Sequence, residues 1–123
     1  MAIITEGNHQ AEFLLGEIDS LSLDTVTLIT GQNIKSGTVL GKITASGKYT
    51  LHNNAASDGS EVAAAISFND VDATSADTPC VVVARTQEVI LSKLIFKEGI
   101  SAPNKTAALA ALATKFIIAR EAM

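Results

Sequence analysis

The stretch KSGTVLGKIT, Lys35–Thr44, combines glycines, lysines and hydroxyl residues in a composition typical of phosphate-binding loops. In a P-loop, four residues separate two glycines, and a lysine and a hydroxyl residue directly follow the second glycine at the start of a helix. Here five residues separate Gly31 from Gly37, and Lys42 is followed by Ile43. The residues TVLGKIT are typical of a strand, not of a helix. The spacing therefore argues against a phosphate site and predicts a turn that leads into a β-strand.

The loop NDVDATSAD resembles the start of a calcium-binding loop, because Asp70, Asp72 and Thr74 alternate along it. An EF-hand loop also needs glycine at its sixth position and glutamate at its twelfth. Those positions hold Ser75 and Val81, and no helix is predicted on either side. We therefore predict a solvated turn and no metal site.

The remaining residues that could perform catalysis are too few to form a local constellation. His9 and His52 are the only histidines and are not spaced as a metal-binding pair. Cys80 is the only cysteine, and its apolar setting TPCVVVAR predicts a buried, inert thiol. No nucleophile elbow is present. We expect neither catalytic nor cofactor-binding residues, and we predict that the protein is not an enzyme.

The composition favours one small domain. The chain has 123 residues, 47% of them hydrophobic but only 4% aromatic, so that Ala, Val, Ile and Leu must build the core. A small domain without large apolar side chains often gains further burial by forming oligomers. The net charge is −4 and the nine Lys and Arg residues are scattered, which argues against nucleic-acid binding. With no signal peptide or membrane-spanning run, we expect a protein made in a reducing cytoplasm and not bound to a membrane.

The chain divides into a predicted flexible arm, residues 1–12, and a predicted β-rich domain, residues 13–123. Proline and alanine content predicts one helix over residues 103–115, with Pro103 in its first turn. Polar turn residues predict connections over residues 31–37, 52–61 and 69–79. A turn at Ser46-Gly47 predicts a hairpin. The secondary structure of residues 92–100 is ambiguous from the sequence. Alternation and β-branched residues predict strands over residues 24–30, 38–44, 48–51, 62–68, 80–85, 86–91 and 116–120, preceded by a strand or turn over 13–18.

The order of these elements predicts the fold class. Short strands joined by hairpins and polar loops favour a mainly β fold, a small antiparallel barrel or sandwich, with one α-helix in the C-terminal half. The arm carries the β-branched pair Ile3-Ile4. Such a segment is either a frayed terminus or a strand that pairs with the sheet edge of another chain and becomes ordered on binding. Composition alone leaves both interpretations open.

Three segments resemble the phage-lambda-type head decoration proteins, also called the capsid-stabilising protein D family. They are NHQAEFLLGE (Asn8–Glu17), TLITGQNIKSGTVLGKIT (residues 27–44) and CVVVARTQEVI (Cys80–Ile90). The likeness extends over nearly the whole chain, from Glu6 to Arg120, and its specificity lies in the order and spacing of the motifs. The matching positions are His9, Glu12, Phe13, Gly31, Gly37, Thr38, Val39, Leu40, Gly41, Arg85 and Val89.

The resemblance implies a structural virion protein. Such a protein binds as homotrimers to the outside of an expanded icosahedral phage head, contacts the major capsid protein and stabilises the shell against the internal pressure of DNA. It has no enzymatic activity, no cofactor and no small-molecule substrate. The resemblance also implies an arm that becomes ordered by pairing with capsid β-structure. The candidate capsid-binding residues are Ile3, Ile4, Thr5, Glu6 and Phe13.

Two other classes of function remain as alternatives. The segment NIKSGTVLGKI is similar to the turn and strand that precede the modified hairpin of biotinyl- or lipoyl-type carrier domains. Lys48 in SGKYT would be the modified residue, although its neighbours do not match those domains. Another small β-domain that acts as a binding module is also compatible with the pattern. A small barrel enzyme would need convergent titratable groups, which the sequence does not offer.

Overall fold

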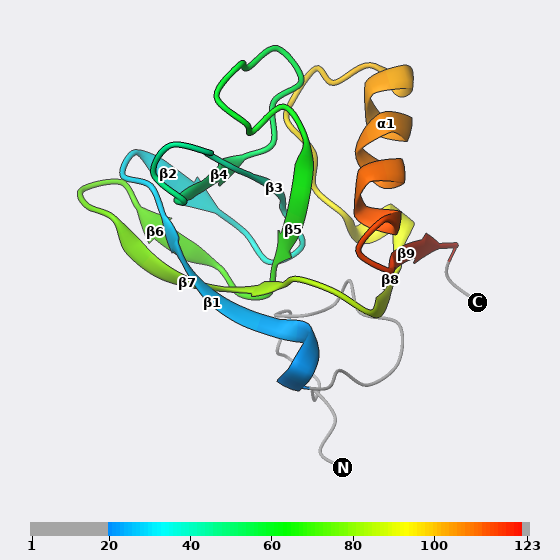
Figure 1. Ribbon diagram of the computed structural model, residues 1–123, viewed down its shortest axis with the longest axis horizontal. Coiled ribbons are helices and arrows are strands. Elements are labelled where there is room, and N and C mark those ends of the chain that lie inside the picture. Colours follow the sequence, from blue (N-terminus) through cyan, green and yellow to red (C-terminus); the bar gives the residue numbers. More distant parts are fainter. Residues whose placement is uncertain (1–19, 122–123) are drawn as a thin grey trace.

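The computed structural model describes residues 20–121. The predicted arm, and the strand or turn predicted over residues 13–18, lie outside the described residues. The described chain begins with the short 3-10 helix η1 (Ser20–Ser22) and consists of a β-barrel with one α-helix, α1 (Ala102–Ala113), alongside it (Figure 1). The predicted mainly β class, with one helix in the C-terminal half, is confirmed.

Five strands form a closed barrel in the order β1-β4-β3-β5-β7. Four of the five neighbouring pairs are antiparallel, as predicted. The exception is β1 and β4, which meet in parallel where Leu28 lies opposite Tyr49. Antiparallel pairing of β3 with β4 confirms the hairpin at Ser46-Gly47. The strands are β1 (Leu23–Leu28), β3 (Val39–Lys42), β4 (Tyr49–Leu51), β5 (Ala63–Ser67) and β7 (Thr78–Val83).

Strand β3 is buried on both faces, and so it separates two apolar cores. Val39 and Leu40 are both fully buried, and because successive side chains in a strand point in opposite directions, each enters a different core. Leu40 lies in a cluster with Leu28, Ala65 and other small side chains inside the barrel. Val39 lies in a second cluster between the barrel and α1. β3 therefore contributes to both cores, and β5 and β7 do the same.

Two strands occur where the sequence predicted only connections. β2 (Gln32–Ile34) and β6 (Val71–Ala73) pair in antiparallel orientation as a separate two-stranded sheet. The prediction of uninterrupted loops over residues 31–37 and 69–79 was therefore wrong. Three residues are too few to establish an alternating pattern, and polar turn residues flank both strands. Ile34, Val71 and Ala73 are buried in the same cluster as Leu40 and extend the core of the barrel.

The C-terminal half covers the second core. α1 (Ala102–Ala113) has Ser101 as its N-cap, whose side chain accepts a hydrogen bond from the Asn104 N–H, and proline lies in its first turn as predicted. The ambiguous residues 92–100 fall in the short 3-10 helix η2 (Leu91–Lys93) and the loop that follows it. β8 (Gln87–Ile90) and β9 (Ile117–Arg120) form a parallel two-stranded ribbon, which departs from the antiparallel pattern that the sequence favoured.

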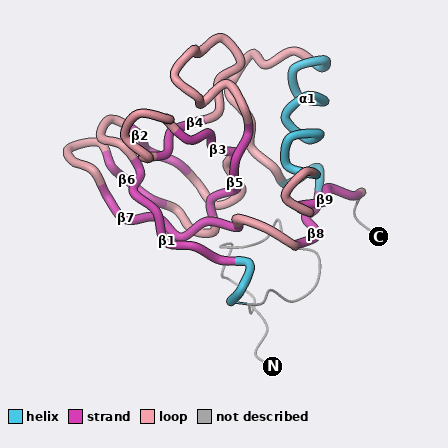
Figure 2. The backbone as a smooth tube through the Cα atoms, viewed as in Figure 1, coloured by secondary structure: helices cyan, strands magenta, loops and turns pink. Residues whose placement is uncertain are grey.

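Loops lie at one end of the barrel, and a further loop connects η2 to α1 (Figure 2). The longest connection inside the barrel sheet runs from β4 to β5 and includes residues 52–62. Figure 1 shows this connection at the same end of the molecule as the start of α1, while β8 and β9 lie beyond the other end of the helix. The segments that precede β1 and β8 lie side by side, because the hydroxyl of Ser22 donates a hydrogen bond to the carbonyl oxygen of Thr86.

Candidate functional site

The glycine-rich stretch serves the packing of the barrel. A Cβ atom on Gly41 would lie 2.5 Å from the carbonyl oxygen of Ser60 and 2.6 Å from its Cα, so only glycine fits between β3 and the loop that precedes β5. Gly37 has a φ of 93°, and its N–H donates to the carbonyl oxygen of Ser67 at 2.8 Å. No helix begins after either glycine. The prediction of a turn that leads into a strand is confirmed.

The aspartates of the calcium-like loop hold the backbone of turns. The carboxylate of Asp70 accepts a hydrogen bond from the N–H of Ser36 at 2.7 Å. The carboxylate of Asp72 accepts from both the hydroxyl and the N–H of Thr74, and these bonds lower the pKa of Asp72. Within residues 20–121, no group of three or more His, Cys, Asp or Glu side chains is placed to hold a metal ion.

The described histidine and the cysteine are core residues. His52 is 1% exposed, and its Nε2–H donates to the carbonyl oxygen of Glu61 at 3.1 Å. Burial lowers the pKa of His52, which keeps the ring neutral. The sequence placed His52 at the edge of a loop and contained no signal for this burial. Cys80 is buried as predicted, and burial raises the pKa of its thiol, so the reactive thiolate is disfavoured.

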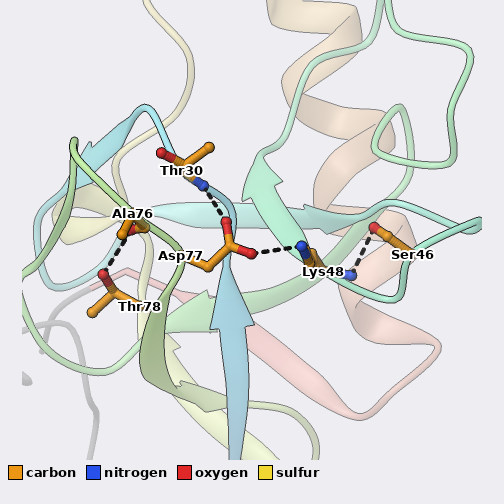
Figure 3. A network of polar contacts seen from close by, with 6 residues as sticks. All are labelled: Thr30, Ser46, Lys48, Ala76, Asp77 and Thr78. Carbon is orange, nitrogen blue, oxygen red and sulfur yellow. Dashed lines mark hydrogen bonds and ion pairs between the residues drawn. The ribbon is translucent and has the colours of Figure 1, made fainter.

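Lys48, the candidate for modification in a carrier domain, is part of an ion pair (Figure 3). Its Nζ lies 2.5 Å from Oδ2 of Asp77, whose other carboxylate oxygen accepts a hydrogen bond from the Thr30 N–H at 2.9 Å. These bonds lower the pKa of Asp77. Figure 3 also shows the Lys48 N–H bonded to the hydroxyl of Ser46 at 3.2 Å. Asp77 therefore links the turn before β4, through Lys48, to the turn after β1, through Thr30, and the use of Lys48 in this ion pair weighs against the carrier interpretation.

One surface combines exposed apolar side chains with basic ones at the place where the described chain begins. We name it the arm-root surface, because it lies next to Ser20, the first residue that the structure describes. Phe116 is 68% exposed and Leu21 is 77% exposed, the largest fractions among the large apolar side chains that the structure describes. The members of the arm-root surface are Leu21, Arg85, Thr86, Lys115 and Phe116.

The five members come from three segments of the chain, namely Leu21, residues 85–86 and residues 115–116, and hydrogen bonds hold these segments side by side. The Arg85 guanidinium donates to the carbonyl oxygen of Leu21 at 2.6 Å and also pairs with the carboxylate of Asp24 at 2.5 Å. The N–H of Thr86 donates to the carbonyl oxygen of Lys115 at 3.0 Å. In addition, the hydroxyl of Ser22 donates to the carbonyl oxygen of Thr86 at 3.0 Å. No sequence motif marks this surface, because its members come from three distant segments and none belongs to a motif for binding.

The candidate capsid-binding residues of the arm, Ile3, Ile4, Thr5, Glu6 and Phe13, lie outside the described residues. The site that the structure does describe is therefore the arm-root surface, at the point where the chain from the arm enters the domain at Ser20. Among the described residues, no helix has the length and apolar character that crossing a membrane requires.

Comparison with known proteins agrees with the family suggested by the motifs. The family model for bacteriophage lambda head decoration protein D matches residues 3–117, a span that includes most of the arm, the whole barrel and α1. A comparison with curated proteins finds no match. The family consists of structural capsid proteins and not of enzymes. The chain therefore belongs to the bacteriophage lambda head decoration protein D family, and its role is the decoration of a phage head.

Proposed function

We propose that the protein binds as a homotrimer to the outside of an expanded icosahedral phage head and stabilises the shell against the internal pressure of the packaged DNA. The observation that carries this proposal is the family match over residues 3–117, which extends through the arm as well as the folded domain. The protein would contact the major capsid protein, act without a cofactor or small-molecule substrate, and be assembled into the virion in the host cytoplasm.

The division into arm and domain supports binding in two parts. The five strands close into a barrel, so the described domain offers fewer open strand edges to a partner than a flat sheet of the same strands would. The arm, with β-branched Ile3 and Ile4, has the composition to add itself to a sheet edge on the capsid. A rigid domain would then cover the junction between capsid subunits. The two β-branched residues, with Thr5, Glu6 and Phe13, remain the candidate contacts.

A trimer suits this role for two physical reasons. A closed trimer uses one head-to-tail interface three times, which matches the three-fold positions of an icosahedral shell. Three linked arms would also raise the effective concentration of each arm at its site, so a modest affinity per arm is sufficient. The small aromatic content of the chain, 4%, is consistent with a domain that gains burial through association.

The proposal is tested with heads of the cognate phage. Purified protein is mixed with expanded, undecorated heads and separately with unexpanded procapsids, and each mixture is sedimented. We expect saturable binding to the expanded heads alone, near one copy per capsid subunit, and a higher temperature for DNA release from decorated heads. Absence of binding to both particles would refute the proposed function.

Deletion of residues 1–12 tests the contribution of the arm. We expect the shortened protein to keep the circular dichroism spectrum and melting temperature of the domain but to lose binding to expanded heads. The matched control replaces Ile3 and Ile4 with valine, which keeps β propensity and apolar character. Binding by the shortened protein that equals that of the full chain would refute the role of the arm.

A further inference from the structure

The pair Asp58-Gly59, in the loop between β4 and β5, has the composition that is most prone to spontaneous change of the backbone. The chain contains no other Asp-Gly pair and no Asn-Gly pair. In such a pair the glycine nitrogen attacks the side-chain carboxyl carbon of the aspartate, because glycine has no side chain to hinder the approach. An N–C bond forms, the carboxyl hydroxyl and the amide hydrogen leave as water, and a cyclic succinimide results. Water then opens the ring at either carbonyl and yields aspartate or isoaspartate.

The loop needs both residues of this pair. Gly59 has a φ of 110°, and a Cβ atom there would lie 2.6 Å from the carbonyl oxygen of Lys42 and 2.9 Å from the nitrogen of Thr44. A larger residue would therefore meet both backbone strain and overlap with backbone atoms. The carboxylate of Asp58 accepts hydrogen bonds from the N–H of Ser60 at 3.0 Å and from its hydroxyl at 2.6 Å, which closes the turn. The fold thus retains the reactive pair for structural reasons.

The attacking nitrogen is held by another side chain. The N–H of Gly59 donates a hydrogen bond to Oε1 of Glu61 at 2.8 Å. Ring closure requires that this nitrogen lose its proton, and so it must give up a hydrogen bond to a charged group. The neighbouring carboxylate also repels the negative charge that develops on the nitrogen as the proton leaves. Both effects of Glu61 oppose the attack.

The carboxyl group of Asp58 is held in its less reactive form. Its hydrogen bonds with Ser60 lower the pKa of Asp58 and so favour the carboxylate. Loss of water during ring closure proceeds from the protonated acid, whose fraction at neutral pH is thereby reduced. The contacts of Asp58 therefore act in the same direction as the contact between Gly59 and Glu61.

We propose that Asp58 is a site of isoaspartate formation that the fold keeps unreactive, and that Glu61 is the residue that protects it by holding the Gly59 N–H. Isoaspartate would lengthen the main chain by one atom, because the chain would then run through Cβ of Asp58. The Asp58 carbonyl oxygen, which accepts from the Thr44 N–H at 2.8 Å, would be displaced. The modification would thus loosen this loop from the end of β3. This inference does not depend on the proposed function.

Replacement of Glu61 tests the protection. The full chain and its variants are kept at mildly acidic pH for several weeks, and isoaspartate is measured with isoaspartyl methyltransferase and assigned to Asp58 by electron-transfer fragmentation of the peptide. Glu61→Ala should form isoaspartate about tenfold faster than the unmodified protein, as for the loss of one hydrogen bond to a charged group. Glu61→Gln retains an oxygen that can accept the bond, so its rate should lie much closer to that of the unmodified protein. In urea the unmodified protein and Glu61→Ala should react at equal rates.

Two further variants serve as controls. Asp58→Ser cannot form the ring and should give no isoaspartate at this position, although its hydroxyl can still accept a hydrogen bond in the turn. Val89→Ala lowers the stability of the domain without contact to the loop, because Val89 is fully buried in β8, which lies beyond the other end of α1 (Figure 1). Its rate of isoaspartate formation should equal that of the unmodified protein.

Three results would overturn the inference. A rate for Glu61→Ala no higher than that of the unmodified protein would show that Glu61 gives no protection. Slower reaction of both Glu61→Ala and Glu61→Gln would show that the carboxylate acts as a base and promotes ring closure. Reaction of Val89→Ala as fast as that of Glu61→Ala would attribute the change to loss of stability in general. None of these results bears on binding to phage heads, so the proposed function is judged separately.

Discussion

Replacement of Gly41 by alanine tests whether the glycine-rich stretch exists for packing. The new methyl group would lie 2.5 Å from the Ser60 carbonyl oxygen and 2.6 Å from the Ser60 Cα. Both are backbone atoms, so no side-chain rotation can relieve the overlap, and the loop before β5 must move. That loop is held by the hydrogen bond from the Asn53 N–H to the Ser60 carbonyl oxygen at 3.1 Å.

The cost is the sum of three contributions. Overpacking of a close-packed core costs about 1–3 kcal/mol, and rigid backbone contacts place this substitution at the upper end. Loss of the loop hydrogen bond adds about 1 kcal/mol. The lower entropy of an unfolded chain with alanine restores roughly 0.4–1 kcal/mol. We expect the free energy of unfolding to fall by about 3 kcal/mol.

Gly31→Ala is the matched control. Gly31 has a φ of 95°, and no heavy atom lies within 4 Å of the position that a Cβ would take, so alanine there meets backbone strain but no overlap. We expect a loss of about 1 kcal/mol after the entropy gain is included. Urea unfolding followed by circular dichroism measures both variants. A Gly41→Ala variant as stable as the unmodified protein, to within about 0.5 kcal/mol, would refute the packing role.

Three further predictions concern buried and capping side chains. Burial lowers the pKa of His52 below 6.5, so the unfolded state binds more protons and stability should decrease as the pH falls below that value; His52→Gln should abolish this slope in urea midpoints, and an equal slope in both proteins would contradict the assignment. Cys80, 1% exposed with a raised pKa, should react with a thiol reagent only on unfolding, and rapid labelling of the native protein would show that the site opens. Ser101→Ala should reduce the free energy of unfolding by about 0.5 kcal/mol, the low end for an N-cap because its hydrogen bond measures 3.4 Å, and a loss above roughly 2 kcal/mol in the urea assay would point to another role.

Much of the fold could be predicted from short stretches of the sequence. The burial of Cys80, the opposite orientations of Val39 and Leu40, and the start of α1 near Pro103 follow from apolar runs, strand alternation and capping preferences. The order of glycine and apolar motifs was also sufficient to indicate the family, because such motifs retain their order along a chain. Each of these inferences depends on residues close together in the sequence.

Tertiary structure decided the remainder. β2 and β6 form because they pair with each other, with Gln32 opposite Ala73, and each segment is too short to be predicted as a strand from its own sequence. The parallel pairing of β8 with β9 depends on where α1 returns the chain. The arm-root surface arises from three distant segments, and the bond from Arg85 to the Leu21 carbonyl oxygen joins two residues that are 64 positions apart. Contacts between distant segments have no local pattern, so the sequence determined the class of protein, and the fold determined which distant residues share a surface.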